Sequence, residues 1–182
     1  MIIRAAVVAL VILTACGSAS TTSTAGTDST SGLLAASAVP GVPYTDTVLT
    51  VGELAKDAAL PDMASRIGSM GYVKGSERTF QGESKHLTFV VSRFLDFTSS
   101  AGAAAYVAYV HDNATAYFGV AGVQPLTSQG RQGWQFTPSA CACHLANPVV
   151  VGAVSNGPVV SWLEINGPDA TPALLLSLLA GT

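Results

Sequence analysis

The sequence is poor in charge and lacks the common catalytic signatures. Asp, Glu, Lys and Arg together make up 10% of its 182 residues, and the formal net charge is −3. Because nucleic-acid binding needs a basic stripe, the few scattered Lys and Arg residues argue against that function. No Gly-x-Ser-x-Gly, His-Glu-x-x-His or Walker pattern occurs, so the common hydrolase and nucleotide-binding signatures are absent. We therefore expect a non-enzymatic protein without a resident cofactor.

Long apolar runs are also missing, apart from a short one at the start of the chain. Uncharged, mostly apolar residues follow Arg4 as far as Leu13, about half of the length that a hydrocarbon core of ~30 Å requires of a spanning helix. A positive start, a short apolar stretch and small residues before a cleavage site are typical of a secretory signal peptide. Residues 1–15 are therefore predicted to be a signal peptide that is cleaved off.

Residues 13–16 read Leu-Thr-Ala-Cys and resemble the bacterial lipobox, in which a Leu and two small residues precede an invariant Cys. The resemblance implies cleavage after Ala15 and a diacylglyceryl thioether on Cys16. The alternative is an ordinary signal peptide with a chance Cys. Two acyl chains are enough for stable anchoring. We therefore expect a lipoprotein held at the outer, extracytoplasmic face of the cell membrane, with the bilayer as its partner.

Charged and large apolar side chains are nearly absent from residues 17–31, which are almost entirely Ser, Thr, Ala and Gly. Such a segment buries too little apolar surface to offset the entropy that ordering would cost. Residues 16–38 are therefore predicted to be the lipidated Cys and a disordered tether. The remaining residues 39–182 have the length of a single domain with a core of its own.

The first half of this domain carries clear periodic patterns. Residues 51–70 predict two short helices separated at Pro61. Tyr72–Gln81, interrupted at Gly75–Ser76, and His86–Phe97 predict the two strands of a hairpin. Both faces of His86–Phe97 are largely apolar, so this strand is expected at the centre of a sheet that is covered on both sides.

The second half predicts further strands between two helices. Hydroxyls at residues 98–100 offer N-caps for a helix from about Ala101 to Asn113, and Thr171–Pro172 caps a last helix. Asn156–Gly157 is a strong hairpin signal, although Pro158 behind it makes a two-residue loop less certain. Strands are expected over Tyr117–Val120, Gly133–Phe136, Cys143–Ala146, Val149–Ser155 and Val159–Ile165. Blocks of strands and helices indicate an α+β fold, a mostly antiparallel sheet with helices packed on it.

Cysteine is scarce as well, with three in the chain, and lipidation of Cys16 leaves Cys141 and Cys143 to each other. In an exported protein this predicts a disulfide, although residues two apart lie near the upper limit of separation for a bridge. The alternative is a soft metal site in which both thiolates and His144 bind Cu(I) or zinc, but four-coordinate zinc needs another ligand. A redox-active dithiol and free thiols also stay open.

Arg93 interrupts an apolar face of the predicted central strand and is a candidate ligand-binding residue. Either a bulge near Ser92 turns it outward, or it is buried and paired with a carboxylate. The carboxylates considered are Glu77, Asp96 and Glu164. If Arg93 anchors a ligand instead, its replacement should abolish binding and leave the melting temperature nearly unchanged. A large loss of stability would speak against that role.

Trp134 and Trp162 are the other candidate ligand-binding residues. Together with Tyr72 and Tyr106 they either line a binding groove for a lipid or a glycan, or pack in the core. An apolar cavity would favour a lipid or small-molecule ligand, whereas a flat apolar patch would favour an envelope protein as partner.

Short motifs within residues 54–182 resemble one group of proteins. They are Gly71-Tyr72, Arg78-Thr79-Phe80, Arg93-Phe94, Ser99-Ser100 and Ala104-Ala105-Tyr106. This pattern is similar to that of cell-envelope lipoproteins of mycobacteria and related actinobacteria, and more distantly to the extracellular sensor domains of their serine/threonine kinases. The resemblance implies a small envelope domain that binds a ligand or supports a partner, and it carries over no catalytic residue. A thiol-based metal-binding or redox protein that uses residues 141–144 is the alternative.

Overall fold

The computed structural model of this chain describes residues 32–58, 60–82, 86–128, 131–136 and 147–180. Cys16, Cys141, Cys143 and His144 lie outside these residues, as does the strand expected at Cys143–Ala146. Among the helices that are described, none combines the length and the apolar character needed to cross a bilayer.

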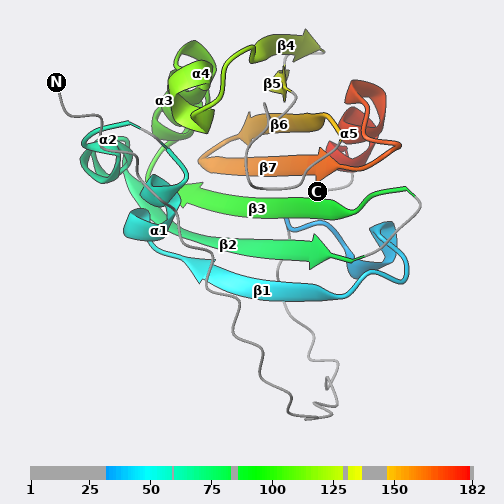
Figure 1. Cartoon of the computed structure of the whole chain (residues 1–182). Helices are drawn as coiled ribbons and strands as arrows, with labels where there is room; N and C mark the ends of the chain where they lie inside the picture. The colour runs from blue at the N-terminus through cyan, green and yellow to red at the C-terminus, as the bar shows by residue number, and fades with distance from the viewer. Residues whose placement is uncertain (1–31, 59, 83–85, 129–130, 137–146, 181–182) are drawn as a thin grey trace, which may run out of the picture.

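The described chain forms one antiparallel sheet with helices packed on it, which confirms the predicted α+β fold (Figure 1). Its seven strands lie in the order β1-β2-β3-β7-β6-β5-β4. The strands are β1 Tyr44–Leu49, β2 Tyr72–Gln81, β3 Phe89–Phe97, β4 Gln124–Ser128, β5 Arg131–Phe136, β6 Val149–Asn156 and β7 Val159–Asn166. The helices are α1 Val51–Lys56, α2 Met63–Ser69, α3 Ser100–Asp112, α4 Ala114–Phe118 and α5 Pro172–Leu179, with a single 3-10 turn η1 at Ala36–Ala38.

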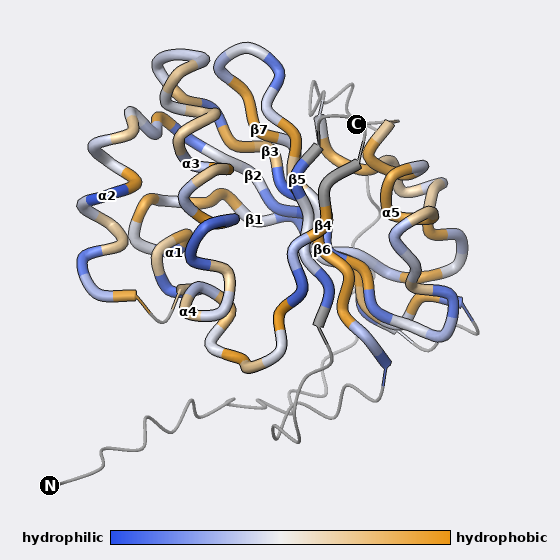
Figure 2. Tube along the Cα trace, turned by 90° about the horizontal axis from the view of Figure 1, so that it is seen from above, coloured by the Kyte–Doolittle hydropathy of each residue, from blue (hydrophilic) through white to orange (hydrophobic). Residues whose placement is uncertain are grey.

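Helices cover both faces of the sheet. Figure 2 shows α1 to α4 on one face and α5 on the other. Because side chains alternate along a strand, each central strand contributes to two cores. The core under α1–α4 includes Leu54, Leu95, Tyr106, Trp134 and Trp162, and the core under α5 includes Phe80, Val90, Leu163, Ile165 and Leu175. The prediction that β3 is central and covered on both sides is confirmed.

Local capping signals place the helices where the sequence predicts them. The hydroxyls of Ser99 and Thr171 accept hydrogen bonds from backbone N–H groups three residues further on, at 3.1 and 3.2 Å, and begin α3 and α5. The two helices expected on either side of Pro61 are α1 and α2. Thr50 and Glu53 form a reciprocal capping box at the start of α1.

Four details of the predicted fold are wrong. Residues 117–120 do not form a strand, because the buried side chains of Ala114 and Tyr117 hold this stretch as helix α4, which ends at Gly119 with φ 67°. Strand β2 is continuous through Gly75, and its irregularity lies between Tyr72 and Lys74. The edge strands β1 and β4 were not expected. The last hairpin forms as expected, but its turn is at residues 157–158 and not at 156–157, since Asn156 pairs with Val159.

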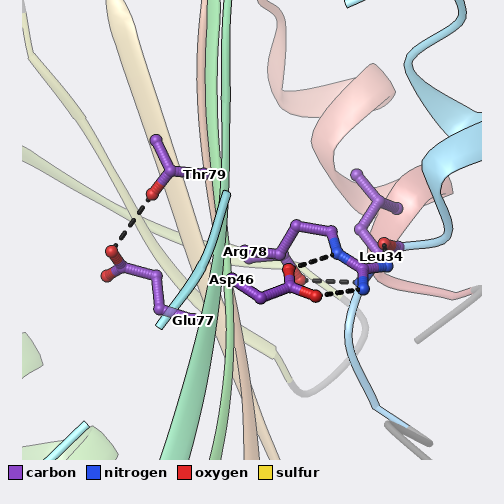
Figure 3. A network of polar contacts seen from close by, with 6 residues as sticks. Leu34, Asp46, Glu77, Arg78 and Thr79 are labelled. Carbon is purple, nitrogen blue, oxygen red and sulfur yellow. Dashed lines mark hydrogen bonds and ion pairs between the residues drawn. The ribbon is translucent and has the colours of Figure 1, made fainter. Parts of the chain in front are cut away.

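The packed chain begins before residue 39, inside the stretch predicted to be tether. Leu33 and Leu34 are buried, and the backbone N–H of Leu34 donates to the hydroxyl of Ser92 at 2.8 Å. Arg78 donates from Nη1 to the Leu34 carbonyl at 3.2 Å. In Figure 3 this contact lies on one side of the sheet, together with Asp46, while Glu77 and Thr79 lie on the other side. Two leucines therefore extend the folded unit toward the N-terminus.

Candidate functional site

A pocket of about 330 Å³ lies on the face of the sheet that α1–α4 cover, above β2, β3 and β7. Ten of the described residues line it, and they come from four elements, β2, β3, α4 and β7, and from the end of helix α1. They are Asp57, Glu77, Thr79, Phe89, Val91, Arg93, Tyr117, Phe118, Trp162 and Glu164. Three of these side chains are carboxylates and five are aromatic or aliphatic, so the lining is both acidic and apolar.

Strand register brings the pocket residues together. Glu77, Arg93 and Trp162 lie side by side in one row across β2, β3 and β7. Thr79, Val91 and Glu164 form the next row, two residues along each strand. Because side chains two residues apart share a face, both rows point the same way. Tyr117 and Phe118 come from α4, and Asp57 follows the end of α1.

Arg93 joins two carboxylates at one side of the pocket. Its Nε donates to Glu77 Oε2 and its Nη1 pairs with Asp57 Oδ2, each at 2.6 Å. Burial opposes the charge of Arg93, but these two carboxylates outweigh it and the pKa of Arg93 is raised. Burial raises the pKa of Asp57, although Arg93 acts in the opposite direction. Arg93 therefore keeps two carboxylates fixed in a partly buried position.

Of the two structural interpretations of Arg93, pairing with a carboxylate is confirmed and the bulge is wrong. The register of β3 runs unbroken through Ser92 to both neighbouring strands. Glu77 was among the partners considered, whereas Asp57 was not. Asp96 lies on the opposite face of β3, three residues away from Arg93 along the strand.

Glu164 is the carboxylate of the pocket that Arg93 does not hold in an ion pair. Among the described residues its side chain makes no hydrogen bond or ion pair within contact distance. Burial raises the pKa of Glu164 to about 7, Arg93 lowers it in part, and the negative charges of Asp57 and Glu77 raise it further. Its charge therefore changes near neutral pH.

Aromatic rings form the wall next to these charges. Trp162 stacks on Trp134 with ring centroids 5.3 Å apart and an angle of 29° between the planes. Phe118 meets Trp134 edge-on at 5.6 Å, and Tyr117 lies 6.0 Å from Trp162. The guanidinium carbon of Arg93 is 5.9 Å from the Trp162 ring centre, within the range of a cation–π contact.

The structure brings the three predicted ligand-binding residues into one region. Arg93 and Trp162 line the pocket, and Trp134 is fully buried behind Trp162. Within the described part of the chain, the indole N–H groups of both tryptophans find no hydrogen-bond acceptor. Tyr72 and Tyr106 do not line the pocket: their hydroxyls bond the Leu49 carbonyl and the hydroxyl of Tyr117.

One group of this lining has the chemistry of a general base. A carboxyl group that titrates near neutral pH is able to act as a general base. The described lining residues include no Ser, Cys, Lys or His, and their hydroxyl groups are those of Thr79 and Tyr117. Among the residues that the structure describes, no three His, Cys, Asp or Glu side chains are grouped to hold a metal ion.

No protein family and no curated protein matches this sequence. Among solved structures, the fold is similar to the extracellular domain of PknH from Mycobacterium tuberculosis, with 13% sequence identity and a TM-score of 0.41. The match covers 77% of this chain and 75% of that one. The similarity to a mycobacterial kinase extracellular domain is thus present but weak.

Proposed function

We propose that this protein is an extracytoplasmic lipoprotein, anchored through Cys16, whose α+β domain binds a small ligand without transforming it. The observation that carries the binding role is the pocket, where the carboxyl group of Glu164, which pairs with no described side chain, lies beside a wall of aromatic rings. Its volume of about 330 Å³ falls at the lower end of the range of small-molecule sites.

Each predicted ligand-binding residue has a role in this proposal. Trp162 offers a flat apolar surface to the ligand, and Trp134 supports it from behind. Arg93 is a positioning residue, because its contacts to Asp57 and Glu77 fix the two carboxylates at the side of the pocket. A small-molecule ligand fits this site better than a protein partner, since an open pocket of about 330 Å³ and not a flat apolar patch carries the mixed lining.

The anchor rests on the sequence of the first sixteen residues. A flexible chain of the length of residues 17–31 has a mean end-to-end distance of roughly 20 Å. That distance separates the folded domain from the headgroups and leaves the pocket accessible to ligands of the cell envelope. The resemblance to actinobacterial envelope lipoproteins supports the same location.

The anchor is tested by expressing the Cys16→Ala variant in a bacterial host and fractionating the cells. We expect the wild-type protein in the membrane fraction with the mass of a diacylglyceryl group, and the variant in the soluble exported fraction without it. Cys141→Ala is the matched control and should stay in the membrane fraction. Equal membrane association of the Cys16→Ala variant would contradict the anchor.

The pocket is tested by mass spectrometry of small molecules and lipids that copurify from a native host. We expect compounds that accompany the wild-type protein and are lost from the Thr79→Trp variant, whose indole would fill the pocket. The Val48→Trp variant adds the same bulk at a side chain that is 71% exposed on the opposite face, and it should keep them. Identical compounds on all three proteins would place the binding site elsewhere.

A thiol-based metal or redox function at Cys141, Cys143 and His144 stays a prediction from the sequence, because these residues lie outside the described part of the chain. Mass spectrometry of the native protein separates it from the binding role. Bound copper or zinc, or a readily reduced bond between the two cysteines, would support it. A stable, metal-free disulfide would exclude it.

A further inference from the structure

Resting on the proposed binding role of this pocket, we propose that its ligand is an organic cation, an amine or ammonium compound with an apolar body, whose charge lies beside Glu164 and whose body lies on Trp162. Four observations lead to this chemical class: the balance of charges, the apolar wall, the absence of a metal arrangement among the described residues, and the position of the unpaired carboxyl group.

The charges of the pocket do not balance. Among the described residues, three carboxylates line it against a single guanidinium group. The described contacts of Arg93 are directed at Asp57 and Glu77, each 2.6 Å away, which leaves Glu164 without an ion pair. A partly buried carboxylate without a partner among the described residues is costly, and a cation at hydrogen-bond distance compensates it. The lining therefore selects for positive charge and repels anions.

The apolar wall lies within reach of the same ligand. Phe89 and Val91 come from β3, Phe118 from α4 and Trp162 from β7, and all four line the pocket together with Glu164. Rings of this kind attract a cation over their faces as well as burying an apolar body. Trp162 already contacts the positive charge of Arg93 at 5.9 Å, so its ring borders the charged part of the pocket.

A bare metal ion does not fit this arrangement. No three acidic or His side chains of the described residues are close enough together to coordinate one. A metal ion would also leave the aromatic wall unused, since oxygen ligands and not rings hold hard cations. A neutral polyol is the remaining rival, because carboxylates accept hydrogen bonds from hydroxyl groups. A neutral polyol carries no positive charge, so it cannot neutralise the carboxylate of Glu164.

Binding of such a cation should depend on pH. The charged and titratable groups that face Glu164 are Arg93 on β3, Glu77 on β2, Asp57 at the end of α1 and Tyr117 on α4. Its neighbours in register on β3 and β6, Val91 and Val151, are apolar. The pKa of Glu164 is about 7, so its carboxylate is mostly ionised above that pH and mostly protonated below it. Affinity should thus fall as pH decreases through 7.

The protein reports on this site by itself, because the chain has two tryptophans, and both belong to the stacked pair at the pocket. Titration of the full-length lipidated protein in detergent, followed by tryptophan fluorescence, measures binding directly. The probes are phenethylamine, its neutral analogue 2-phenylethanol and the anion phenylacetate, which share the ring and differ in charge. Phenethylamine stays cationic throughout, so changes of affinity with pH come from the protein.

We expect phenethylamine to bind at about pH 8 and to bind about tenfold more weakly at about pH 6. The neutral alcohol should bind at least about tenfold more weakly than the amine at the higher pH, and phenylacetate should not bind. The Glu164→Gln variant should lose the preference for the amine and the dependence on pH. Asp96→Asn, which removes a carboxylate from the opposite face of β3, is the matched control and should bind like the wild-type protein.

Several results would overturn the inference: equal affinity for the amine and the alcohol, binding of phenylacetate, an unchanged pH dependence in Glu164→Gln, or no response to millimolar phenethylamine. The proposed binding role fails by a different result, namely identical copurifying compounds on the wild-type and Thr79→Trp proteins. A neutral or anionic compound that is lost with Thr79→Trp would keep the pocket as a binding site and reject the cation.

Discussion

At the scale of one residue, Glu164 shows how a carboxyl group in the candidate site affects the stability of the fold. Its ordinary pKa is near 4.5, and burial raises the pKa of Glu164 to about 7 in the folded protein. Folding therefore favours the protonated form. As pH rises from the unfolded to the folded pKa, the unfolded chain releases its proton first and stability falls. The loss is then complete above pH 7 and amounts to as much as about 3 kcal/mol.

The Glu164→Gln variant should therefore be more stable than the wild-type protein at alkaline pH. Gln resembles the protonated carboxyl group, so we expect a gain of up to about 3 kcal/mol in the free energy of unfolding at about pH 8 and almost none at about pH 4. Urea unfolding without ligand at both pH values measures it. A gain that is equal at both values would show that burial of the charge is not the cause.

Arg93 stabilises the folded protein, whereas the charge of Glu164 destabilises it. Its side chain is 11% exposed and holds Glu77 and Asp57, which are 18% and 36% exposed. Arg93→Met would leave both carboxylates without their cation, and breaking a buried pair in this way costs about 3 kcal/mol. Urea unfolding should show that loss. A stability near that of the wild-type protein, combined with lost binding, would instead make Arg93 a direct ligand anchor.

Arg78→Met provides the control for this prediction. Arg78 contacts the carboxylate of Asp46 at 2.7 Å, the carbonyl of Leu34 and the ring of Tyr44, but Asp46 is 46% exposed. Pairs that water solvates contribute about 1 kcal/mol or less. If the two Met variants lost the same stability, burial would not explain the strength of the Arg93 contacts.

At the scale of elements, helices α2 and α3 cover the face of the sheet that carries the pocket, and they approach each other closely. Helix α3 carries Gly102 at its first turn, where a Cβ atom would lie 2.0 Å from the carbonyl oxygen of Met70, at the end of α2. The Met70 oxygen belongs to the backbone, so it cannot move out of the way as the end of a flexible side chain can. Glycine is therefore needed here for close approach and not for a special backbone angle.

Gly102→Ala should destabilise the protein by about 2 kcal/mol, because α3 must move away from α2. Gly68→Ala is the matched control in α2, since a Cβ atom there has no neighbour within 4 Å. It should stabilise the protein by about 0.5–1 kcal/mol, because alanine loses less conformational entropy in a helix. Thermal unfolding of both variants measures this. Effects of the same sign would mean that contact with Met70 does not limit the position of α3.

At the scale of the whole molecule, the N-terminal segment belongs to the fold. Leu33 and Leu34 are 7% and 3% exposed, and Leu34 belongs to the core under α5. We expect a chain that begins at Val39 to be less stable by about 4 kcal/mol than one that begins at Gly32, because it loses two buried leucines and the hydrogen bond to Ser92. Urea unfolding of the two proteins measures the difference. Equal stability would return the boundary to residue 39.

The sequence predicts best those parts of the fold that a few neighbouring residues decide. Hydroxyls at Ser99 and Thr171 begin α3 and α5 because a cap needs only an N–H group three residues away. Strand β3 is recognisable because both of its faces are apolar. Strand β1 is not, since five of its six residues are exposed and show no alternation. Helix α4 is too short for a period and is held by burial against the sheet.

For the candidate site, too, the sequence predicts some features and only the tertiary structure decides the others. The sequence by itself determined the signal-like start, the α+β class and the anomaly of a charged Arg93 among apolar neighbours, because composition and periodicity are local properties. Only the tertiary structure decided that Asp57, Glu77 and Glu164 meet around it. These residues come from the end of α1, from β2 and from β7, and their meeting depends on strand order and register. Burial, which gives Glu164 its pKa near 7, exists only after the distant segments have packed together.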